Sequence, residues 1–190
     1  DFRDPWSDMD YLDEFKMGAR ARRKLVEMEK EVVKNCDHII INSPSVATVH
    51  LEILKNHKHT LIPNGWDKND FENVKSVSNN RQSFRIGHFG ALYGSRNAPG
   101  LWKAVTRWNS EHERQVEIIL MGSIGEEVRK DMENIECIKY SAGVNHKEAI
   151  LEMMNCDALL LVQNDTDPAR KCTPGKVFEY LATQKPIFSV

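Results

Sequence analysis

The chain lacks the features that identify several common classes of protein. Its 190 residues carry a formal net charge of −2, so no overall positive field favours nucleic acid or an anionic membrane as a partner. No apolar run approaches the roughly 20 residues that span a bilayer. The first residues, DFRDPW, contain neither a starting Met nor the apolar core of a signal peptide. We therefore expect a globular protein in the cytoplasm.

Cysteine and histidine patterns exclude further classes of site. The four cysteines are widely separated and include no C-x-x-C pair, which favours reduced thiols over disulfides or zinc ligands. No Ser-His-Asp, Cys-His or H-E-x-x-H arrangement is present among the seven histidines. His112 and His146 are expected to be solvated or to cap helices. The sequence therefore gives no reason to expect a histidine-based catalytic centre.

The first third of the chain predicts two helices and two short strands that end at a polar stretch. Ser7–Asp10 is expected to cap a helix that continues to Asn35. The sequence PNGWD predicts a turn, and residues 67–83 are polar without periodicity, so a domain boundary is expected there. The other elements expected before it are a strand at 37–42, a helix at 44–55 and a strand at 59–62.

Residues 84–190 predict an α/β fold with a Rossmann-like parallel sheet. Apolar strands without polar alternation are separated by helices of about ten residues, which is typical of a parallel sheet covered on both faces. The expected strands are 84–89, 116–121, 136–139, 158–162 and 186–190, and the expected helices are 97–109, 125–134, 146–155 and 175–183. The ending within an apolar run suggests a piece of a longer chain, with its last strand at a sheet edge.

A glycine-rich turn follows the first of these strands. The sequence GHFGALYGSRNAPG (87–100) places glycines ahead of a helix, where backbone N–H groups and the helix dipole favour an anion. Arg96 can add two donors to a phosphate. The spacing matches neither G-x-G-x-x-G nor a Walker loop, and a tight turn with a solvated arginine is the alternative. The candidate binding residues are Gly90, Tyr93, Gly94, Ser95 and Arg96.

A second candidate anion site lies in CTPGKVFEYLA (172–182). Thr173 is expected to cap a helix with Pro174 in its first turn, and Gly175 keeps the approach clear. Lys176 in the first turn opposes the helix dipole, a conflict that a bound anion would relieve. Glu179, one turn further on, can accept hydrogen bonds from a diol. The alternative is a surface Lys–Glu pair worth a few tenths of a kcal/mol.

Both candidate loops follow parallel strands, so we expect them to meet at the edge where doubly wound sheets bind ligands. Together they predict one wall of a nucleotide-diphosphate pocket. Gly122 lies in a third strand–glycine–helix turn near the same edge, although Glu126 and Glu127 in that turn disfavour a phosphate. Asp165 and Asp167 resemble a metal-binding pair, but a polar loop is the more ordinary explanation of them.

The motifs, in order, resemble the GT-B glycosyltransferases of the glycogen-synthase-like "group 1" type. The resemblance covers nearly the whole chain, from CDHIIINSPS through TLIPNGWD, FRIGHFGALYGSRNAPGLWKAV, EIILMGS and CDALLLVQN to TPGKVFEYLATQKPI. It implies that residues 1–66 are the tail of the acceptor-side domain and the start of the linker. Residues 67–83 would be the linker, and 84–190 an incomplete domain that binds the nucleotide-sugar donor.

The resemblance also implies roles for individual residues. Arg96 and Lys176 would stabilise the donor diphosphate during catalysis, and Glu179 would bind the ribose hydroxyls. Gly143 and Val144 would lie against the nucleobase. The sequence departs from the family at two positions: Ala91 replaces an arginine that commonly follows the first glycine, and Lys171 replaces the first glutamate of E-x7-E.

The implied function is transfer of a sugar from a UDP- or GDP-sugar to a glycan or lipid-linked acceptor, in bacterial surface polysaccharide or glycoconjugate synthesis. No metal and no other cofactor is expected, and the full-length protein would lie in the cytoplasm or at the inner face of the membrane. The fragment alone is expected to be inactive and to pair with a second copy through its edge strands. A GT-B sugar-nucleotide epimerase and a non-catalytic nucleotide-binding domain are the alternatives.

Overall fold

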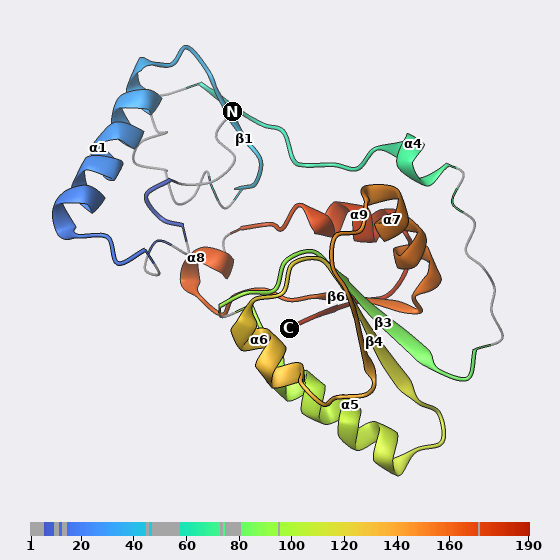
Figure 1. The fold of residues 1–190 in the computed structure, drawn as a ribbon. Helices are drawn as coiled ribbons and strands as arrows, with labels where there is room; N and C mark the ends of the chain where they lie inside the picture. The colour runs from blue at the N-terminus through green and yellow to red at the C-terminus, as the bar shows by residue number, and fades with distance from the viewer. Residues whose placement is uncertain are drawn as a thin grey trace. The chain divides into compact units, whose positions relative to one another are not determined.

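The computed structural model describes residues 6–9, 12, 15–44, 46, 58–72, 74, 81–94, 96–170 and 172–190. The chain forms two compact units, which Figure 1 draws in one view. Unit 1 comprises Asp1–Gly65 and Asn164–Gly175, and unit 2 comprises Trp66–Gln163 and Lys176–Val190. The domain limits inferred from the sequence stay a prediction.

Unit 2 contains a five-stranded parallel sheet in the order β5-β4-β3-β6-β7. The order reverses between β3 and β6, which is the topology of a doubly wound Rossmann-like sheet. The predicted α/β fold with a parallel sheet is therefore confirmed. The strands are β3 (Phe84–Phe89), β4 (Val116–Met121), β5 (Ile138–Ser141), β6 (Ala158–Leu161) and β7 (Ile187–Ser189).

Helices cover both faces of this sheet (Figure 1). Helices α5 (Pro99–Glu111) and α6 (Glu126–Met132) pack on one face, where fully buried Trp102 and Val128 join the strand residues Ile118 and Leu120. Helices α7 (His146–Asn155) and α9 (Lys176–Ala182) pack on the other. Because both faces are buried, the strands need apolar residues on both sides, which explains their lack of polar alternation.

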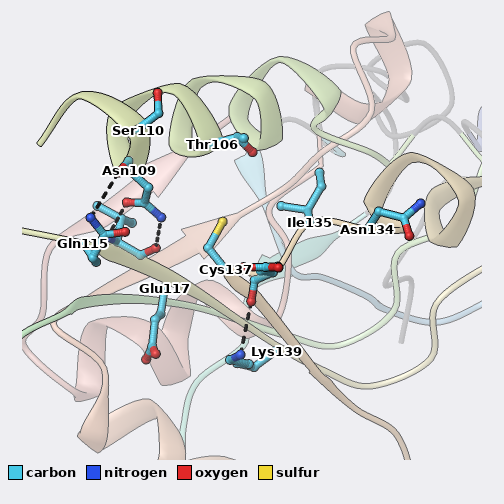
Figure 2. Close-up of a pocket in the computed structure, with 11 residues that line it drawn as sticks. Thr106, Asn109, Ser110, Gln115, Glu117, Asn134, Ile135, Cys137 and Lys139 are labelled. Carbon is cyan, nitrogen blue, oxygen red and sulfur yellow. Dashed lines mark hydrogen bonds between the residues drawn. The ribbon is translucent and has the colours of Figure 1, made fainter.

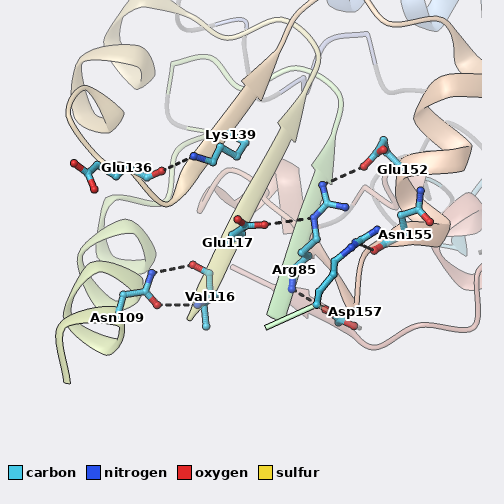
Figure 3. A network of polar contacts seen from close by, with 10 residues as sticks. Arg85, Asn109, Val116, Glu117, Glu136, Lys139, Glu152, Asn155 and Asp157 are labelled. Atoms are coloured by element: carbon cyan, nitrogen blue, oxygen red, sulfur yellow. Dashed lines mark hydrogen bonds and ion pairs between the residues drawn. The ribbon is translucent and has the colours of Figure 1, made fainter. Parts of the chain in front are cut away.

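A polar network at the amino end of β3 ties the strand to its neighbours (Figure 3). The Arg85 guanidinium lies 3.2 Å from the carboxylate of Glu152 on α7 and 3.7 Å from that of Glu117 on β4. The Arg85 backbone N–H donates to Asp157 just before β6, at 2.7 Å. The Arg85 side chain is only 16% exposed, so the carboxylates of Glu152 and Glu117 offset part of the cost of removing its charge from water.

Unit 1 contains α1 (Ala19–Asn35) and the parallel strand pair β1 (Ile39–Ile41) and β2 (His59–Leu61). Their small core is formed by buried aliphatic side chains, namely Val33, Ile39, Ile41 and Val46. The short helix α8 (Asp167–Arg170) belongs to the same unit. Most of the helix predicted at 44–55 lies outside the described residues.

The predicted start of the first helix at Ser7 is wrong. Helix α1 begins at Ala19, after Gly18 in an extended conformation and Lys16 at a positive φ of 48°. Ser7 instead donates its hydroxyl and its backbone N–H to the buried carboxylate of Glu29, in the middle of α1. The serine therefore satisfies a buried side chain rather than a helix terminus.

The polar stretch that follows PNGWD is not entirely irregular. Asp67 accepts a hydrogen bond from the N–H of Asn69 at 2.9 Å and caps a short helix, α4 (Lys68–Phe71).

None of the four cysteines, all at described positions, forms a disulfide. Across the part of the chain that the structure describes, no helix has the length and apolarity to cross a membrane.

Candidate functional site

The turn after β3 brings a backbone glycine against a lysine side chain. Gly90 has a φ of +132°, and a β-carbon built there would lie 2.6 Å from Nζ of Lys176. The lysine ammonium therefore occupies the space that any other residue at position 90 would fill with its side chain. This contact joins two of the residues that the sequence predicted for one anion site.

The turns after β3 and β4 pack backbone against backbone. A β-carbon on Gly122, whose φ is +135°, would lie 2.4 Å from the carbonyl oxygen of Gly90. The Gly90 N–H donates to the Met121 carbonyl at 2.7 Å. Gly122 thus permits the close approach of the two turns, which gives this glycine a packing role. Contact between Gly122 and a ligand stays a prediction.

Helix α9 is fixed to the sheet by Tyr180. Its fully buried phenol accepts from the Phe89 N–H at 2.9 Å and donates to the Leu160 carbonyl at 3.3 Å. Burial raises the pKa of this phenol, so it stays protonated at neutral pH and can serve both bonds. Because Lys176 and Glu179 lie on the same short helix, this anchor sets the position of both.

Lys176 is a destabilised cation. Burial, followed by repulsion from Arg96, lowers the pKa of Lys176 to about 8, while Glu179 acts in the opposite direction. Two cations that repel one another at a sheet's carboxyl edge are stabilised by an anion bound beside them. The charges of Arg96 and Lys176 therefore interact with each other, and their binding of one anion stays a prediction.

The buried side chain of His88 contacts the Lys176 ammonium, and His88 was not predicted as part of the site. Its Nδ1 is 2.9 Å from the Leu160 carbonyl, which can only accept, so Nδ1 carries the proton. Nε2 is then an acceptor, and it lies 3.5 Å from the Lys176 ammonium. Burial and the Lys176 charge lower the pKa of His88 to about 4. A neutral imidazole thus faces the lysine without adding positive charge.

Arg96 is half-buried in the turn before α5. Its guanidinium lies over the ring of Tyr93, 5.3 Å from the ring centre, and donates to the phenol oxygen at 3.5 Å. Gly94, between β3 and Arg96, has a positive φ of 55°. Tyr93 therefore helps to orient Arg96 through stacking. Ser95 lies outside the described residues.

The carboxylate of Glu179 contacts the imidazole of His146. His146, the first residue of α7, places Nε2 3.0 Å from Oε1 of Glu179, and its Nδ1 is 3.7 Å from Oδ2 of Asp70 on α4. His146 is exposed, as predicted, but it is not the helix cap, which is Asn145. It also contacts two carboxylates, because α4 and α9 bring Asp70 and Glu179 to the start of α7. His112, by contrast, is the C-cap of α5, as predicted.

The residues just before Lys176 differ from the sequence expectation. Helix α9 begins at Lys176, so Thr173 is not in the N-cap position. Thr173, Pro174 and Gly175 belong to unit 1, where a β-carbon on Gly175 would contact the side chain of Asn64 at 3.7 Å. A ligand contact by these three residues stays a prediction, and Lys171 lies outside the described residues.

The loop between β5 and α7 carries the predicted base-binding residues. Gly143 has a positive φ of 70° with open space around its α-carbon, and Val144 is half-buried beside it. The next residue, Asn145, caps α7. This loop therefore leads directly to His146 and its contact with Glu179.

The acidic pair Asp165 and Asp167 is bound by an arginine. The Arg170 guanidinium contacts the carboxylates of both aspartates. Among the described residues, no group of three or more His, Cys, Asp or Glu side chains is placed to hold a metal ion. The arginine gives this polar loop a structural explanation.

A separate hollow of about 600 Å³ lies at the opposite end of the sheet, near the starts of β4 and β5 (Figure 2). The side chains of Asn109 and Gln115, which line this hollow, form hydrogen bonds with nearby backbone groups. Asn109 bonds both the N–H and the carbonyl of Val116, at 2.7 and 2.9 Å. Gln115 donates to the carbonyls of Asn109 and His112. These contacts stabilise the junction between α5 and β4.

Neither a protein-family model nor a curated protein sequence matches the chain. The chain does match solved structures. The chain is similar to HepE from Anabaena, in complex with UDP and glucose, with a TM-score of 0.65 and 18% identity over 95% of this chain and 50% of that one. It is also similar to the pneumococcal O-GlcNAc transferase GtfA, in complex with UDP and GlcNAc, with a TM-score of 0.63 and 15% identity. A TarM variant from S. aureus, in complex with fondaparinux, alpha-GlcNAc-glycerol and UDP, gives a TM-score of 0.60 and 10% identity.

The comparisons cover a larger share of this chain than of its neighbours. The GtfA and TarM matches each cover 87% of this chain and 32% of the other. This chain therefore spans about a third to a half of the length of the solved structures that it matches. At these identities the likeness establishes the fold, and it confirms the expected GT-B architecture.

Sequence reasoning missed His88, Asp70 and Tyr180, and it gave His146 no partner. His88 carried a weak signal, since it stands two residues before Gly90 at the end of a strand. Asp70 carried none, because only the fold brings it to a histidine 76 positions away.

Proposed function

We propose that the chain is the donor-binding part of a glycosyltransferase that moves a sugar from a nucleotide-diphosphate sugar to an acceptor. Supporting observations are the GT-B fold and the cluster of Gly90, Arg96, Lys176 and Glu179 in unit 2. The observation that carries the proposal is the packing of the Lys176 ammonium over the Gly90 backbone at the carboxyl edge of the sheet.

The chemistry follows from the charges. A diphosphate bound beside Gly90 would receive hydrogen bonds from Lys176 and Arg96. As the bond from the anomeric carbon to the diphosphate breaks, negative charge grows on the leaving phosphate oxygen. The two cations stabilise that charge without a bound metal. The neutral state of His88 matters here, because a positive charge on its ring, 3.5 Å from the Lys176 ammonium, would repel that lysine.

The remaining contacts of the donor are part of the proposal. Glu179 would accept hydrogen bonds from the ribose hydroxyls, and Gly143 and Val144 would lie against the base. Tyr93, Gly94, Ser95, Gly122, Thr173, Pro174 and Gly175 complete the proposed binding residues. The donor is a UDP- or GDP-sugar. The UDP in the complexes of HepE, GtfA and TarM supports the first of these.

The setting of the reaction is likewise proposed. A glycan or a lipid-linked molecule would be the acceptor, in bacterial surface polysaccharide or glycoconjugate synthesis, in the cytoplasm or at the inner face of the membrane.

A homodimer through β7 is also proposed, since β7 is an edge strand and its Phe188 is half exposed. Sedimentation at rising concentration that shows only monomer would contradict the dimer.

Calorimetric titration with UDP, GDP and their hexose conjugates tests the function. We expect binding by the wild-type chain and an affinity loss of about 2 kcal/mol in Lys176→Ala, the typical worth of a hydrogen bond to a charged group. Lys103→Ala, which removes an exposed lysine of α5, is the matched control. Failure of every nucleotide to bind the wild-type chain would refute the proposal.

Because the fragment alone is expected to be inactive, assays of the intact parent protein for hydrolysis, epimerisation and sugar transfer separate the enzymatic alternatives. Transfer to an acceptor supports the proposed reaction. Inversion at a ring carbon of the sugar without transfer would identify an epimerase. Binding without any of the three reactions would identify a nucleotide-binding domain.

A further inference from the structure

Three side chains from three helices of unit 2 form a line of polar contacts next to Lys176. Asp70 comes from α4, His146 from α7 and Glu179 from α9. The imidazole lies between the carboxylates, 3.0 Å from Glu179 and 3.7 Å from Asp70. Glu179 and Asp70 are 30% and 34% exposed. The line is therefore open to a ligand and yet partly shielded from water.

The hydrogen-bond direction follows from the chemistry of the partners. An ionised carboxylate only accepts, so Nε2 of His146 carries a proton and donates it to Oε1 of Glu179. On the opposite side of the ring the Asp70 carboxylate lies 3.7 Å from Nδ1, and it favours this orientation of the imidazole when Nδ1 also carries a proton. The second carboxylate oxygen of Glu179 remains as an acceptor for a ligand, because a carboxylate has about four lone-pair sites.

The backbone at His146 does not depend on its imidazole. Asn145 accepts from the Glu148 N–H at 3.0 Å, and Glu148 accepts from the Asn145 N–H at 3.2 Å. This capping box secures the start of α7 without the histidine side chain. The imidazole therefore has no capping task, and its placement between two carboxylates calls for a different explanation.

Glu179 also has a competing neighbour. Lys176 stands three residues before it on α9, and its charge interacts with the Glu179 carboxylate. At this spacing the two side chains can pair with each other. Such a pair would occupy both Lys176, which is proposed to bind the phosphate, and Glu179, which is proposed to bind the ribose. A histidine that holds Glu179 from the other side keeps the two groups apart.

We propose that His146 is a positioning residue that holds Glu179 ready for the ribose hydroxyls of a ribonucleoside diphosphate, and that Asp70 orients the imidazole. The inference rests on the proposed function, since it assigns Glu179 to the ribose. A site built to bind hydroxyl groups rejects an analogue that lacks them, because its polar groups then lose their partners. Selectivity for ribose should therefore depend on His146.

The test compares matched pairs of nucleotides on the whole 190-residue chain. UDP and 2′,3′-dideoxy-UDP are titrated by calorimetry, with GDP and 2′,3′-dideoxy-GDP in parallel, against wild type, His146→Ala, His146→Gln and Asp70→Asn. The glutamine amide can reach the place of Nε2 and donate as the imidazole does. His112→Ala is the control, since it alters an exposed histidine at the end of α5.

We expect His146→Ala to lower the affinity for the ribonucleotide about tenfold and to leave the dideoxy analogue within about twofold. His146→Gln should restore most of the preference, and Asp70→Asn should show an intermediate loss of about threefold, as suits a partly exposed contact. His112→Ala should bind both nucleotides as wild type does.

Other outcomes overturn the inference. Equal losses for the ribo and dideoxy forms in His146→Ala would indicate a general structural role. Tighter ribonucleotide binding in that variant would show that the histidine blocks Glu179. Wild-type preference for ribose that survives in His146→Ala would refute this inference alone. A wild-type chain that binds no nucleotide would refute the proposed function together with it.

Discussion

At Gly90, a single missing β-carbon allows a cation to reach the backbone of the site. The Lys176 ammonium fills the position that a side chain would take, and the φ of +132° is one that L-residues rarely adopt. Substitution therefore has two separable effects, backbone strain and displacement of the lysine.

We expect Gly90→Ala to lower the free energy of unfolding by about 1 to 3 kcal/mol through backbone strain. Nucleotide affinity should fall as well, because the flexible end of Lys176 must move. Gly100→Ala in α5 is the matched control, since a β-carbon there has no atom within 4 Å and helical alanine is preferred to glycine. Urea unfolding and nucleotide titration measure the two effects. Equal behaviour of the two variants would contradict this account.

Lys176 should make nucleotide binding depend on pH. Burial and Arg96 lower its pKa to about 8 in the unbound protein, and a bound diphosphate would favour the charged form and raise that pKa. Binding therefore takes up a proton above pH 8, so affinity should be level near pH 7 and decline as pH rises towards 9. Lys176→Arg should remove this decline, because arginine stays charged. A flat wild-type profile in calorimetry would show that Lys176 does not meet the ligand.

At the scale of elements, α9 depends on hydrogen-bond partners outside its own sequence. Helix α9 has seven residues, too few to be stable alone. The Tyr180 hydroxyl holds it by bridging a buried N–H of β3 and a carbonyl of β6. That bridge positions Lys176 and Glu179, the two side chains of this helix that are proposed to bind the ligand.

We expect Tyr180→Phe to lower the free energy of unfolding by about 1 to 3 kcal/mol, because the Phe89 N–H would lose its partner in a buried place. Tyr140→Phe, which alters an exposed tyrosine on β5, should stay within about 0.5 kcal/mol of wild type. Denaturant unfolding of both variants gives the comparison. A Tyr180→Phe protein as stable as the Tyr140→Phe protein would rule out the anchoring role.

Element boundaries were predictable where local signals were complete. The strands at 84–89 and 116–121 and the helix at 146–155 were predicted with the observed limits. The helix carries its capping box in sequence, Asn145 with Glu148. The third strand of the sheet runs from Ile138 to Ser141 rather than 136–139, because its register is set by pairing with β4. The first helix begins later than predicted, because Ser7 binds Glu29 instead of capping.

At the scale of the whole molecule, protonation of His88 makes the free energy of unfolding depend on pH. Its pKa is lowered from 6.5 to about 4, so as pH falls the unfolded chain takes up the proton first. Stability from this group is complete above pH 6.5 and is lost as pH falls towards 4. The difference of about 2.5 pH units corresponds to about 3 kcal/mol.

His88→Asn tests this linkage, since asparagine can still donate to Leu160 but does not titrate. We expect the variant to be less stable than wild type at pH 7, with the gap smaller by about 2 to 3 kcal/mol at pH 4.5. Denaturant unfolding at both pH values provides the measurement. A gap that stays constant would mean that His88 is not the titrating group.

The sequence by itself determined the α/β class and the strand-to-helix turns, and it indicated Gly90, Arg96, Lys176 and Glu179 as candidate binding residues, because apolar periodicity, glycine and helix-terminal residues are local signals. Only the tertiary structure decided that His88 lies under Lys176 and that His146 joins Asp70 to Glu179. These pairs are separated by 33 to 88 positions, and a contact over such a distance arises from strand order and helix packing, which no short stretch of sequence encodes.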